Sequence, residues 1–210
     1  MITENSQCLT PLSTNTFNCA YSPAQNVIYI CGAYARGDIY NAEMSDEDLY
    51  ARLGMVIGHE ISHAFDSTGA QYDKDGTMKQ WWTDEDWAAF QERNEKLSAY
   101  YNNIHPWEGQ DFVDNKTGEA CADMGGIKCM LRLAAKKDGF DYDKFFRSFA
   151  DMWLLKDSLV MEYQNLSDEH PMNYLRVNCT LQQFDEFLDF YGIEEGDKMY
   201  LAPEDRVNIW

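Results

Sequence analysis

The chain has 210 residues, of which 45% are hydrophobic, and this length and composition suffice to bury the core of one domain. Its formal net charge of -19 excludes a nucleic-acid partner, because proteins that bind phosphate backbones need clustered Lys and Arg side chains. The acidity mainly indicates a solvated surface, and attraction of cationic peptides to an acidic cleft is the less favoured alternative.

Apolar stretches in the chain are short. The longest, over residues 54–57 and 149–155, fall far below the roughly 20 residues that a membrane helix needs. Residues 1–10 contain neither a basic start nor an apolar run, so no signal peptide is predicted. We therefore expect a chain that is soluble as given, with no membrane segment, and its cellular location stays open.

The six cysteines are too sparse for a small disulfide-stapled protein, and their disulfide status stays open. No two of them form a CxxC pair, so a zinc site built from thiolates has little support.

The first predicted element is a short strand over residues 26–31, which are β-branched and aromatic and lie between a Ser-Pro turn signal and a glycine. A helical pattern follows over residues 46–65. Ser45, with Asp48 three residues later, resembles a capping box at the start of this helix. Residues 71–77 have the composition of a turn, and they predict either a small hairpin or an irregular loop.

Four further helices are predicted from apolar spacing and end signals. They cover residues 84–101, 119–137, 142–155 and 181–191, with Thr83 capping the first and Thr180 capping the last, which ends at Gly192. Aromatic side chains on the helix over residues 142–155 form one apolar face, which indicates core packing rather than a ligand site. No repeat, low-complexity tract or linker is visible. We therefore expect one domain over residues 1–210, mainly α-helical with a small sheet near the N-terminus.

The strongest motif, Gly58-His59-Glu60-Ile61-Ser62-His63, lies in the helix predicted over residues 46–65. Histidines four residues apart leave one face of a helix about one turn apart, so His59 and His63 can bind one zinc ion. Glu60 points about 100 degrees around the helix, where it can reach a water on the metal and take its proton as general base. The alternative is a solvated helix face with two unrelated histidines, and the presence of a third ligand decides between the two.

A third ligand is offered by the helix predicted over residues 119–137. Glu119 and Asp123 are four residues apart and share one face of this helix. Glu119 would complete a site of two histidines and one glutamate, and Asp123 could accept the ring N–H of a zinc-binding histidine. Without the histidine motif, both acids would be interpreted as solvent-facing side chains at a helix start, where the helix dipole favours them.

Several motifs in order resemble the neprilysin and endothelin-converting enzyme family of zinc metallopeptidases. They occupy residues 18–23, 56–66, 81–83, 119–126, 170–176 and 206–210 and cover nearly the whole chain. The resemblance implies the α+β fold of a thermolysin-like zinc peptidase catalytic domain. It also implies one Zn2+ per chain, held by His59, His63 and Glu119, with Glu60 as general base and Asp123 as a catalytic acid that does not touch the metal.

The resemblance assigns roles to four more residues. His170 and Arg176 match a His and an Arg six residues apart in the family, which implies that His170 stabilises the oxyanion and Arg176 binds a substrate carbonyl. Asn18 and Cys19 match a segment that pairs with the substrate backbone as an added strand. Cys19 replaces the usual alanine of that segment, a change that main-chain pairing tolerates. From its spacing alone, Asp66 is a candidate partner for the ring of the second zinc histidine.

Family members are much longer than this chain and carry an N-terminal helical region that closes over the site and restricts substrates to peptides. The resemblance therefore implies peptide substrates and a missing N-terminal region or partner chain. The chain could be a fragment, a split gene product or a reduced form of the family.

The leading hypothesis is a zinc-dependent endopeptidase that hydrolyses oligopeptides through a zinc-activated water. The alternative is a zinc-stabilised peptide-binding module, or an inactive fragment, that has lost turnover together with the family's N-terminal region. A third interpretation, an acidic helical interaction domain in which the motifs are coincidental, predicts that no zinc is retained.

Overall fold

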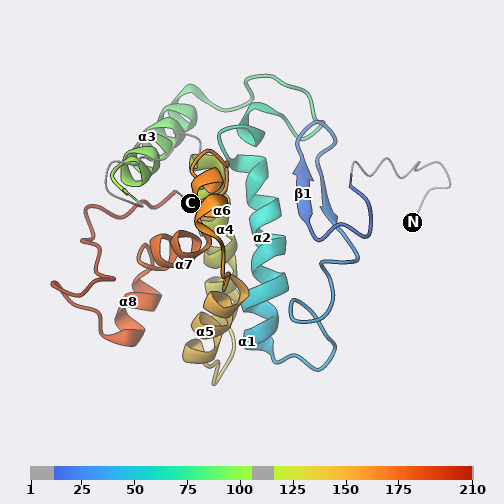
Figure 1. The fold of residues 1–210 in the computed structure, drawn as a ribbon. Helices are drawn as coiled ribbons and strands as arrows, with labels where there is room; N and C mark the ends of the chain where they lie inside the picture. Colours follow the sequence, from blue (N-terminus) through green and yellow to red (C-terminus); the bar gives the residue numbers. More distant parts are fainter. Residues whose placement is uncertain (1–11, 106–115, 210) are drawn as a thin grey trace.

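The computed structural model describes residues 12–105 and 116–209 (Figure 1). Residues 1–10, for which no signal peptide is predicted, and Trp210, the last residue of the terminal motif, lie outside the described residues. Among the described residues, no helix combines the length and the apolar character that crossing a membrane requires.

The sheet is an antiparallel hairpin of β1 (Cys19–Ser22) and β2 (Val27–Ile30), with Cys19 opposite Ile30 and Ser22 opposite Val27. Asn26 closes the turn with a φ of 50°, a left-handed conformation that Asn tolerates better than most residues. The strand predicted over residues 26–31 is confirmed by β2, and β1 adds a partner that the strand pattern did not predict.

The histidine motif lies on one continuous helical rod, as predicted over residues 46–65. The hydroxyl of Ser45 accepts a hydrogen bond from the backbone N–H of Asp48 at 3.3 Å and caps the start of this rod. The rod consists of α1 (Asp46–Leu49), a π-helical turn (Tyr50–Gly54), α2 (Met55–Ser62) and a 3-10 turn (His63–Phe65). The π-helical turn was not predicted, and it lies directly before the helix that carries His59.

A short connection leads from this rod to the next long helix. A 3-10 turn (Gly69–Gln71) is followed by an isolated antiparallel bridge between Tyr72 and Met78, so residues 71–77 form a minimal hairpin. The next helix, α3 (Asp84–Asn102), begins at Thr83, whose hydroxyl accepts a hydrogen bond from the N–H of Asp86 at 3.1 Å. The predicted cap and the predicted helix over residues 84–101 are both confirmed.

The buried helix α4 (Thr117–Ala134) runs along α2, and the two helices approach closely where glycines replace side chains (Figure 1). A Cβ on Gly58 would lie 3.0 Å from Gly126 Cα, and a Cβ on Gly126 would lie 2.6 Å from the carbonyl oxygen of Met55. Glycine at both positions therefore lets the two backbones touch. The predicted helix over residues 119–137 is confirmed, although it ends three residues early.

The helix α5 (Tyr142–Met152) begins at Asp141, whose side chain accepts a hydrogen bond from Lys144 N–H at 3.0 Å. The predicted end at residue 155 is wrong. The chain leaves the helix at Trp153, whose carbonyl accepts a hydrogen bond from Asn173 Nδ2 at 3.1 Å and whose ring lies 4.0 Å from the Arg176 guanidinium carbon. These contacts with a distant segment replace the last helical turn.

The prediction of one last helix over residues 181–191 is also wrong. The chain forms α7 (Asn173–Leu181) and α8 (Asp185–Tyr191), and Thr180 is a buried residue near the end of α7 rather than an N-cap. The break lets Leu181 and Phe184 both enter the core, while the side-chain oxygen of Gln183 accepts a hydrogen bond from Val207 N–H at 2.8 Å.

Two other features complete the C-terminal part. The short helix α6 (Leu159–Asn165), capped by the Ser158 hydroxyl, was not predicted. The predicted stop at Gly192 is confirmed, because this residue ends α8 in a left-handed conformation with a φ of 61°.

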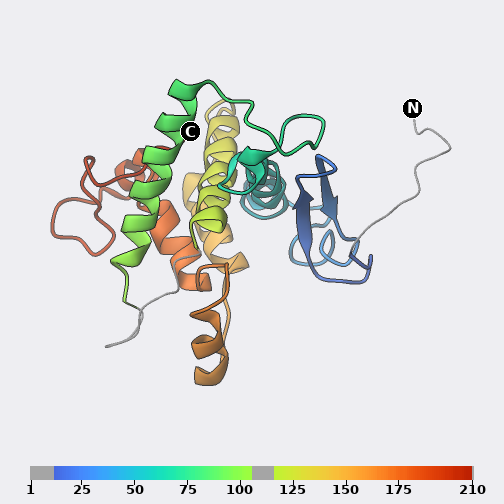
Figure 2. The ribbon, with the colours of Figure 1, turned by 90° about the horizontal axis from the view of Figure 1, so that it is seen from above.

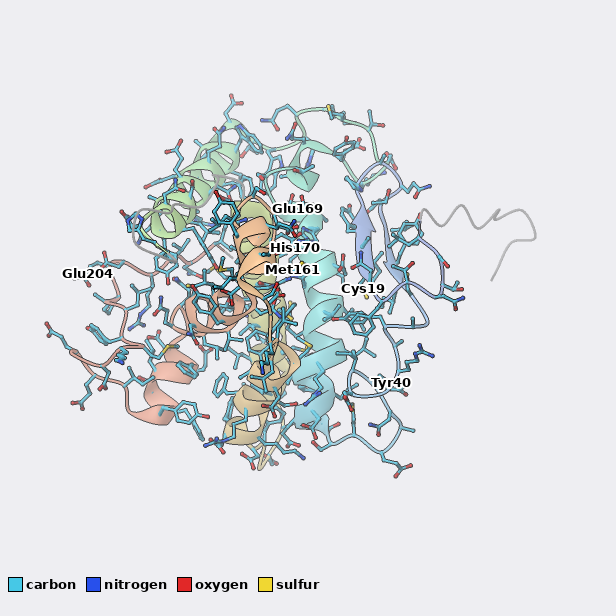
Figure 3. The ribbon with its side chains drawn as sticks, in the orientation of Figure 1. Cys19, Tyr40, Met161, Glu169, His170 and Glu204 are labelled. Carbon is cyan, nitrogen blue, oxygen red and sulfur yellow. The ribbon has the colours of Figure 1, made fainter. Side chains whose placement is uncertain are left out.

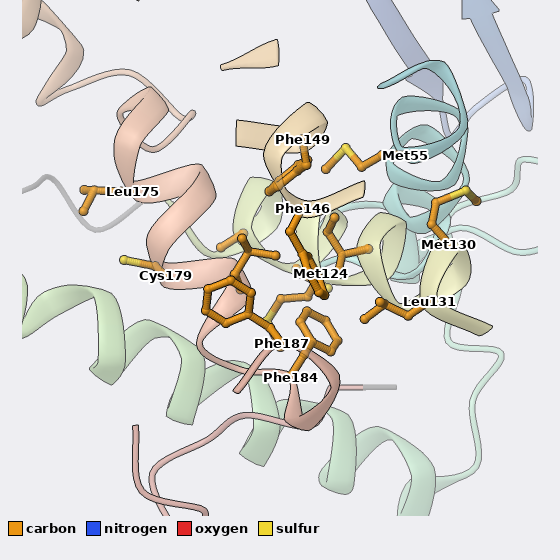
Figure 4. Close-up of a cluster of buried hydrophobic side chains, with 14 of the residues drawn as sticks. Met55, Met124, Met130, Leu131, Phe146, Phe149, Leu175, Cys179, Phe184 and Phe187 are labelled. Carbon is orange, nitrogen blue, oxygen red and sulfur yellow. The ribbon is translucent and has the colours of Figure 1, made fainter. Parts of the chain in front are cut away.

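The core lies between α4 and the helices α5, α7 and α8, where Phe146, Phe149, Phe184 and Phe187 pack together (Figure 4). The hairpin lies on the other side of α2 from these helices (Figures 1 and 2), and Cys19 of β1 is buried in the same core cluster. The predicted architecture, mainly helical with a small sheet near the N-terminus, is confirmed. It leaves one face of α2 between the hairpin and the C-terminal helices.

Candidate active site

The two histidines of the motif converge as their spacing predicts. His59 lies near the end of α2 and His63 in the 3-10 turn that follows, and their Nε2 atoms are 3.0 Å apart. His59 is buried and His63 is partly buried, so both rings are held by the surrounding structure.

Glu119, in the first turn of α4, brings a carboxylate to both histidines. Its Oε2 lies 3.3 Å from His59 Nε2, and its Oε1 lies 3.4 Å from His63 Nε2. Ligand atoms at 2.0–2.1 Å from a tetrahedral zinc ion are about 3.3 Å apart, so the three groups have the spacing of a zinc site.

A further observation supports this fit. Glu119 Oε2 is buried and accepts no hydrogen bond, and Arg176 Nη2 lies 3.6 Å from it, beyond hydrogen-bond distance, so this oxygen keeps a lone pair free for a metal ion. His59, His63 and Glu119 are also one of the sets of described residues whose ligand atoms lie close enough to hold a metal ion. The donor set therefore fits zinc in both chemistry and spacing.

Two aspartates orient the histidine rings. Asp123 Oδ1 lies 2.8 Å from His59 Nδ1, and Asp66 Oδ2 lies 2.6 Å from His63 Nδ1. Because an ionised carboxylate only accepts hydrogen bonds, each ring donates its Nδ1–H and leaves the Nε2 lone pair for a metal. The contact proposed from spacing between Asp66 and His63 is present, and Asp66 is itself fixed by backbone N–H groups of Thr68 and Gly69 at 2.7 Å.

Arg176, on α7, binds Asp123 rather than standing free. Its Nε donates to Asp123 Oδ2 at 2.8 Å and its Nη2 donates to Oδ1 at 2.6 Å, a two-point ion pair that is almost wholly buried. Burial alone would raise the pKa of Asp123, but the Arg176 charge and the His59 hydrogen bond outweigh it and hold this pKa at about 2. Asp123 is therefore a carboxylate at neutral pH.

Glu60 lines the cleft beside the histidines and is almost fully buried. Burial raises its pKa, and the nearby His59 and His63 rings oppose part of this rise. A carboxylate with a raised pKa is suited to take and return a proton near neutral pH.

His170 reaches the site from the loop between α6 and α7. Its Nε2 lies 3.4 Å from Glu119 Oε2, and its Nδ1 lies 2.7 Å from Asp168 Oδ1. The backbone N–H of His170 also donates to the same aspartate oxygen at 2.8 Å. The sequence analysis did not identify Asp168, although its position two residues before a candidate histidine indicated a possible partner for that ring.

Asn18 and Cys19 lie at the opposite wall of the cleft. The Asn18 side chain accepts a hydrogen bond from Cys19 N–H at 2.9 Å, and within residues 12–105 and 116–209 the only strand that pairs with β1 is β2. Burial, with a smaller contribution from the Glu60 charge, raises the pKa of Cys19 to about 12, so this side chain is a neutral thiol at neutral pH. The five cysteines among the described residues, Cys19, Cys31, Cys121, Cys129 and Cys179, are all free.

Apart from Asp123 and Asp168, which contact the lining side chains from behind, these groups line one cleft of about 590 Å³. It is bounded by the hairpin on one side, by α2 along its floor, and by the segments after α5 and α6 on the other side. Apolar and aromatic side chains that no motif had singled out supply much of its wall, namely Tyr34, Ile39, Met55, Trp153 and Leu154. They come from separate segments, so nothing in their local sequence indicated a shared site.

The chain is similar over most of its length to known peptidases. The family model described as Peptidase family M13 matches residues 18–207. Neutral endopeptidase of Lactococcus lactis subsp. cremoris is 38% identical over 194 residues, which make up 92% of this chain and 31% of that protein. Endothelin-converting enzyme 1 of Rattus norvegicus is 29% identical over 217 residues, or 96% of this chain and 28% of that protein. The chain thus spans about a third of the length of these relatives.

Among solved structures, the chain is also similar to peptidases. Zinc metalloprotease Zmp1 of Mycobacterium tuberculosis, in complex with an inhibitor, has a TM-score of 0.89 and 28% identity over 96% of this chain and 33% of that chain. PepO from Lactobacillus rhamnosis HN001 also has a TM-score of 0.89, with 29% identity over 96% of this chain and 32% of that chain. The predicted resemblance and the predicted fold class are therefore confirmed. This chain belongs to peptidase family M13, a family of zinc metallopeptidases.

Proposed function

We propose that this chain is a zinc-dependent endopeptidase that hydrolyses oligopeptides. The observation that carries the proposal is the convergence of His59, His63 and Glu119 at the spacing of zinc ligands, with Glu60 lining the same cleft. Membership in a metallopeptidase family supports the same activity.

In this proposal the Nε2 atoms of His59 and His63 and the carboxylate of Glu119 hold one zinc ion. When bound, zinc acidifies water and polarises the carbonyl group of the scissile peptide. Glu60 accepts a proton from the attacking water and returns it to the leaving amine. The raised pKa of Glu60 supports both transfers, because the group must hold the proton between them.

Asp123 and Arg176 are proposed to act as a buried pair. Asp123 holds the His59 ring in the tautomer that leaves Nε2 free, and Arg176 keeps Asp123 ionised. Arg176 also lines the cleft, and this position supports the role of binding a substrate carbonyl.

His170 is proposed to stabilise the negative charge that develops on the carbonyl oxygen. Its position beside Glu119, with Asp168 holding Nδ1, aims Nε2 at the region where the scissile group must lie. Asp168 is a positioning residue in this scheme, because it reaches the substrate only through His170.

Substrate binding is proposed to use Asn18 and Cys19 on β1. The edge of β1 that does not pair with β2 belongs to a strand lining the cleft, where an extended peptide could add as a further strand. Residues 1–210 are proposed to act as one catalytic domain. Since the curated relatives are about three times as long, a further region or a partner chain is proposed to complete the peptide subsites.

The test is cleavage of a quenched-fluorescent peptide mixture by the zinc-loaded chain and its Glu60→Gln variant. We expect the variant to lose about 10²–10⁴-fold in turnover while it retains zinc, because only the proton acceptor is removed. Glu204→Gln, at an exposed glutamate outside the cleft, is the matched control. Equal turnover in wild type and Glu60→Gln would contradict the mechanism, and peptide binding without cleavage would favour the non-catalytic binding module.

A further inference from the structure

A second hollow adjoins the catalytic cleft. It is a groove of about 280 Å³ formed by the end of α5, the segment after it, α6 and α7. Four residues line both the groove and the cleft, namely Trp153, Leu154, Leu155 and Asn173. Asn173 Nδ2 donates a hydrogen bond to the carbonyl oxygen of Trp153 at 3.1 Å and so ties this shared wall to α7. The groove therefore continues from the cleft along residues that are held in place.

The groove presents apolar side chains to solvent. Leu154 and Leu155, where the groove meets the cleft, are 78% and 61% exposed, and Tyr174 on α7 is 50% exposed. Val177 adds a partly buried apolar side chain one turn further along α7. Exposed apolar side chains that gather beside a cleft are typical of a surface that a ligand covers.

The groove also carries negative charge. Asp157, which precedes α6, and Glu162, on α6, both line it. Within the part of the chain that the structure describes, no Lys or Arg forms a salt bridge with either carboxylate. Burial raises the pKa of Tyr174, with smaller contributions from Cys179 and the Glu162 charge, so Glu162 lies near this apolar ring. A ligand with a cationic group beside an apolar one would complement this surface.

The remaining walls suit a peptide backbone. The side chains of Asn165 and Asn178 line the groove, and an amide side chain can both donate and accept hydrogen bonds, as an extended backbone requires. The helix α6 projects from the other helices (Figure 2), and none of its residues is buried. Its side chains are therefore available to a ligand rather than committed to the core.

We propose that this groove binds the part of a long peptide substrate that extends out of the catalytic cleft, and that it selects an apolar residue next to a Lys or Arg. Tyr174 and Leu155 contact the apolar side chain, and Glu162 binds the cation. The inference rests on the proposed peptidase function and defines the class of peptide that the same site prefers. A peptide is the occupant because the groove shares its wall with the cleft in which the peptide is cut.

The experiment measures kcat and KM separately for a quenched-fluorescent core peptide and for extended forms of it. Leu-Lys, Leu-Glu or Ser-Ser is added at either end through Gly-Ser spacers of increasing length, which are flexible. The zinc-loaded wild type is compared with Tyr174→Ser and Glu162→Gln. The matched controls are Tyr163→Ser, at an exposed tyrosine of α6 outside the groove lining, and Glu204→Gln, at an exposed glutamate far from Met161 of α6 (Figure 3).

We expect Leu-Lys at one end to lower KM at least about tenfold relative to Ser-Ser without a change in kcat, because burial of an apolar side chain away from the scissile bond strengthens ground state and transition state equally. Tyr174→Ser should remove most of this gain. Glu162→Gln should remove the preference for Leu-Lys over Leu-Glu, which we expect to be about two- to fivefold at an exposed ion pair. Both controls should keep the gain, and all variants should cleave the core peptide like wild type.

Three results would overturn the proposal. The first is no gain from Leu-Lys at either end with any spacer. The second is a gain that survives unchanged in Tyr174→Ser and Glu162→Gln. The third is an equal loss for core and extended peptides in these variants, which would give the two residues a structural role.

Fluorescence anisotropy of the labelled peptides separates the groove from the peptidase function. A chain that cleaves no peptide, but binds Leu-Lys more tightly than Leu-Glu and loses this preference in Glu162→Gln, would refute the proposed peptidase function and retain the groove. A chain that cleaves the core peptide but neither binds nor cleaves the extended forms better would do the reverse.

Discussion

At the scale of single residues, the site depends on carboxylates that each control one histidine ring. Asp66 binds Nδ1 of His63, Asp123 binds Nδ1 of His59, and in both cases the Nε2 atoms turn toward Glu119. The metal affinity of such a site is set partly by these outer hydrogen bonds, because they choose the tautomer and fix the ring.

Replacing Asp66 by Asn tests this control. Asn retains an oxygen for the N–H groups of Thr68 and Gly69, but it places an NH2 donor opposite His63 Nδ1. The ring must then carry its proton on Nε2, where it blocks the metal. We expect zinc affinity, measured by competition with a chromophoric chelator, to fall about 10–100-fold, while Asp189→Asn on the exposed face of α8 leaves it unchanged.

The buried thiol of Cys179 makes stability depend on alkaline pH. Burial raises its pKa from 9.0 to about 11, against a smaller opposing effect of a hydrogen bond from Tyr100, so the folded chain holds this proton more tightly than the unfolded chain. The contribution of the protonated Cys179 thiol to the free energy of unfolding is fully present below pH 9 and is lost as pH rises from about 9 to about 11.

We expect the difference in unfolding free energy between wild type and Cys179→Ala to narrow by about 2 kcal/mol between pH 7.5 and 10.5. Urea unfolding at each pH measures it, and the same comparison for Cys129→Ala, at an exposed cysteine, is the control. A difference in unfolding free energy that stays constant with pH would contradict the raised pKa of Cys179.

At the scale of elements, the site requires α2 and α4 to lie in backbone contact. Gly58 and Gly126 permit this approach, and it brings Glu119, two helical turns before Gly126, to the histidines of α2. Any side chain between the helices would separate them and widen the distances among the ligand atoms.

Gly126→Ala should therefore affect both stability and metal binding. The new Cβ would lie 2.6 Å from Met55 O and 3.1 Å from His59 N, backbone atoms that can move only if the helices shift. We expect a loss of about 1–3 kcal/mol in unfolding free energy, measured by urea titration, together with weaker zinc binding. Gly32→Ala, whose Cβ would meet nothing closer than Thr14 O at 3.7 Å, is the matched control, and equal behaviour of the two variants would refute the packing argument.

At the scale of the whole molecule, the cleft joins four distant parts of the chain. The hairpin, α2, the start of α4 and the segments around α6 and α7 each contribute a wall or a ligand. A metal held by α2 and α4 therefore ties together parts that would otherwise be connected only by packing.

Removal of zinc should lower the stability of the whole fold. At a free zinc concentration of about 1,000 times Kd, binding adds about 4 kcal/mol to the unfolding free energy, provided that the unfolded chain does not bind zinc. We expect a chelator to lower the Tm in differential scanning fluorimetry, and zinc but not magnesium to restore it. A Tm that does not respond to zinc would argue against a metal shared by α2 and α4.

Much of the fold could be predicted from local sequence. The capped helices beginning after Ser45 and Thr83 and the stop at Gly192 followed from end signals that act through neighbouring backbone groups. The wrong predictions concern helix ends that are determined by contacts with residues distant in the sequence. The end of α5 at Trp153 and the break before Phe184 are set by partners more than 15 residues away, namely Asn173 and Val207.

The same division applies to the site. By itself, the sequence determined the identity and spacing of His59, Glu60, His63, Glu119 and Asp123, because these lie on two helices whose periodicity places side chains on a face. Only the tertiary structure decided that Arg176 is bound to Asp123, that Asp168 holds His170, and that Glu169 stands beside Glu119. The physical reason is that helical periodicity acts over one or two turns, whereas contacts between loops and helices depend on how the whole chain packs.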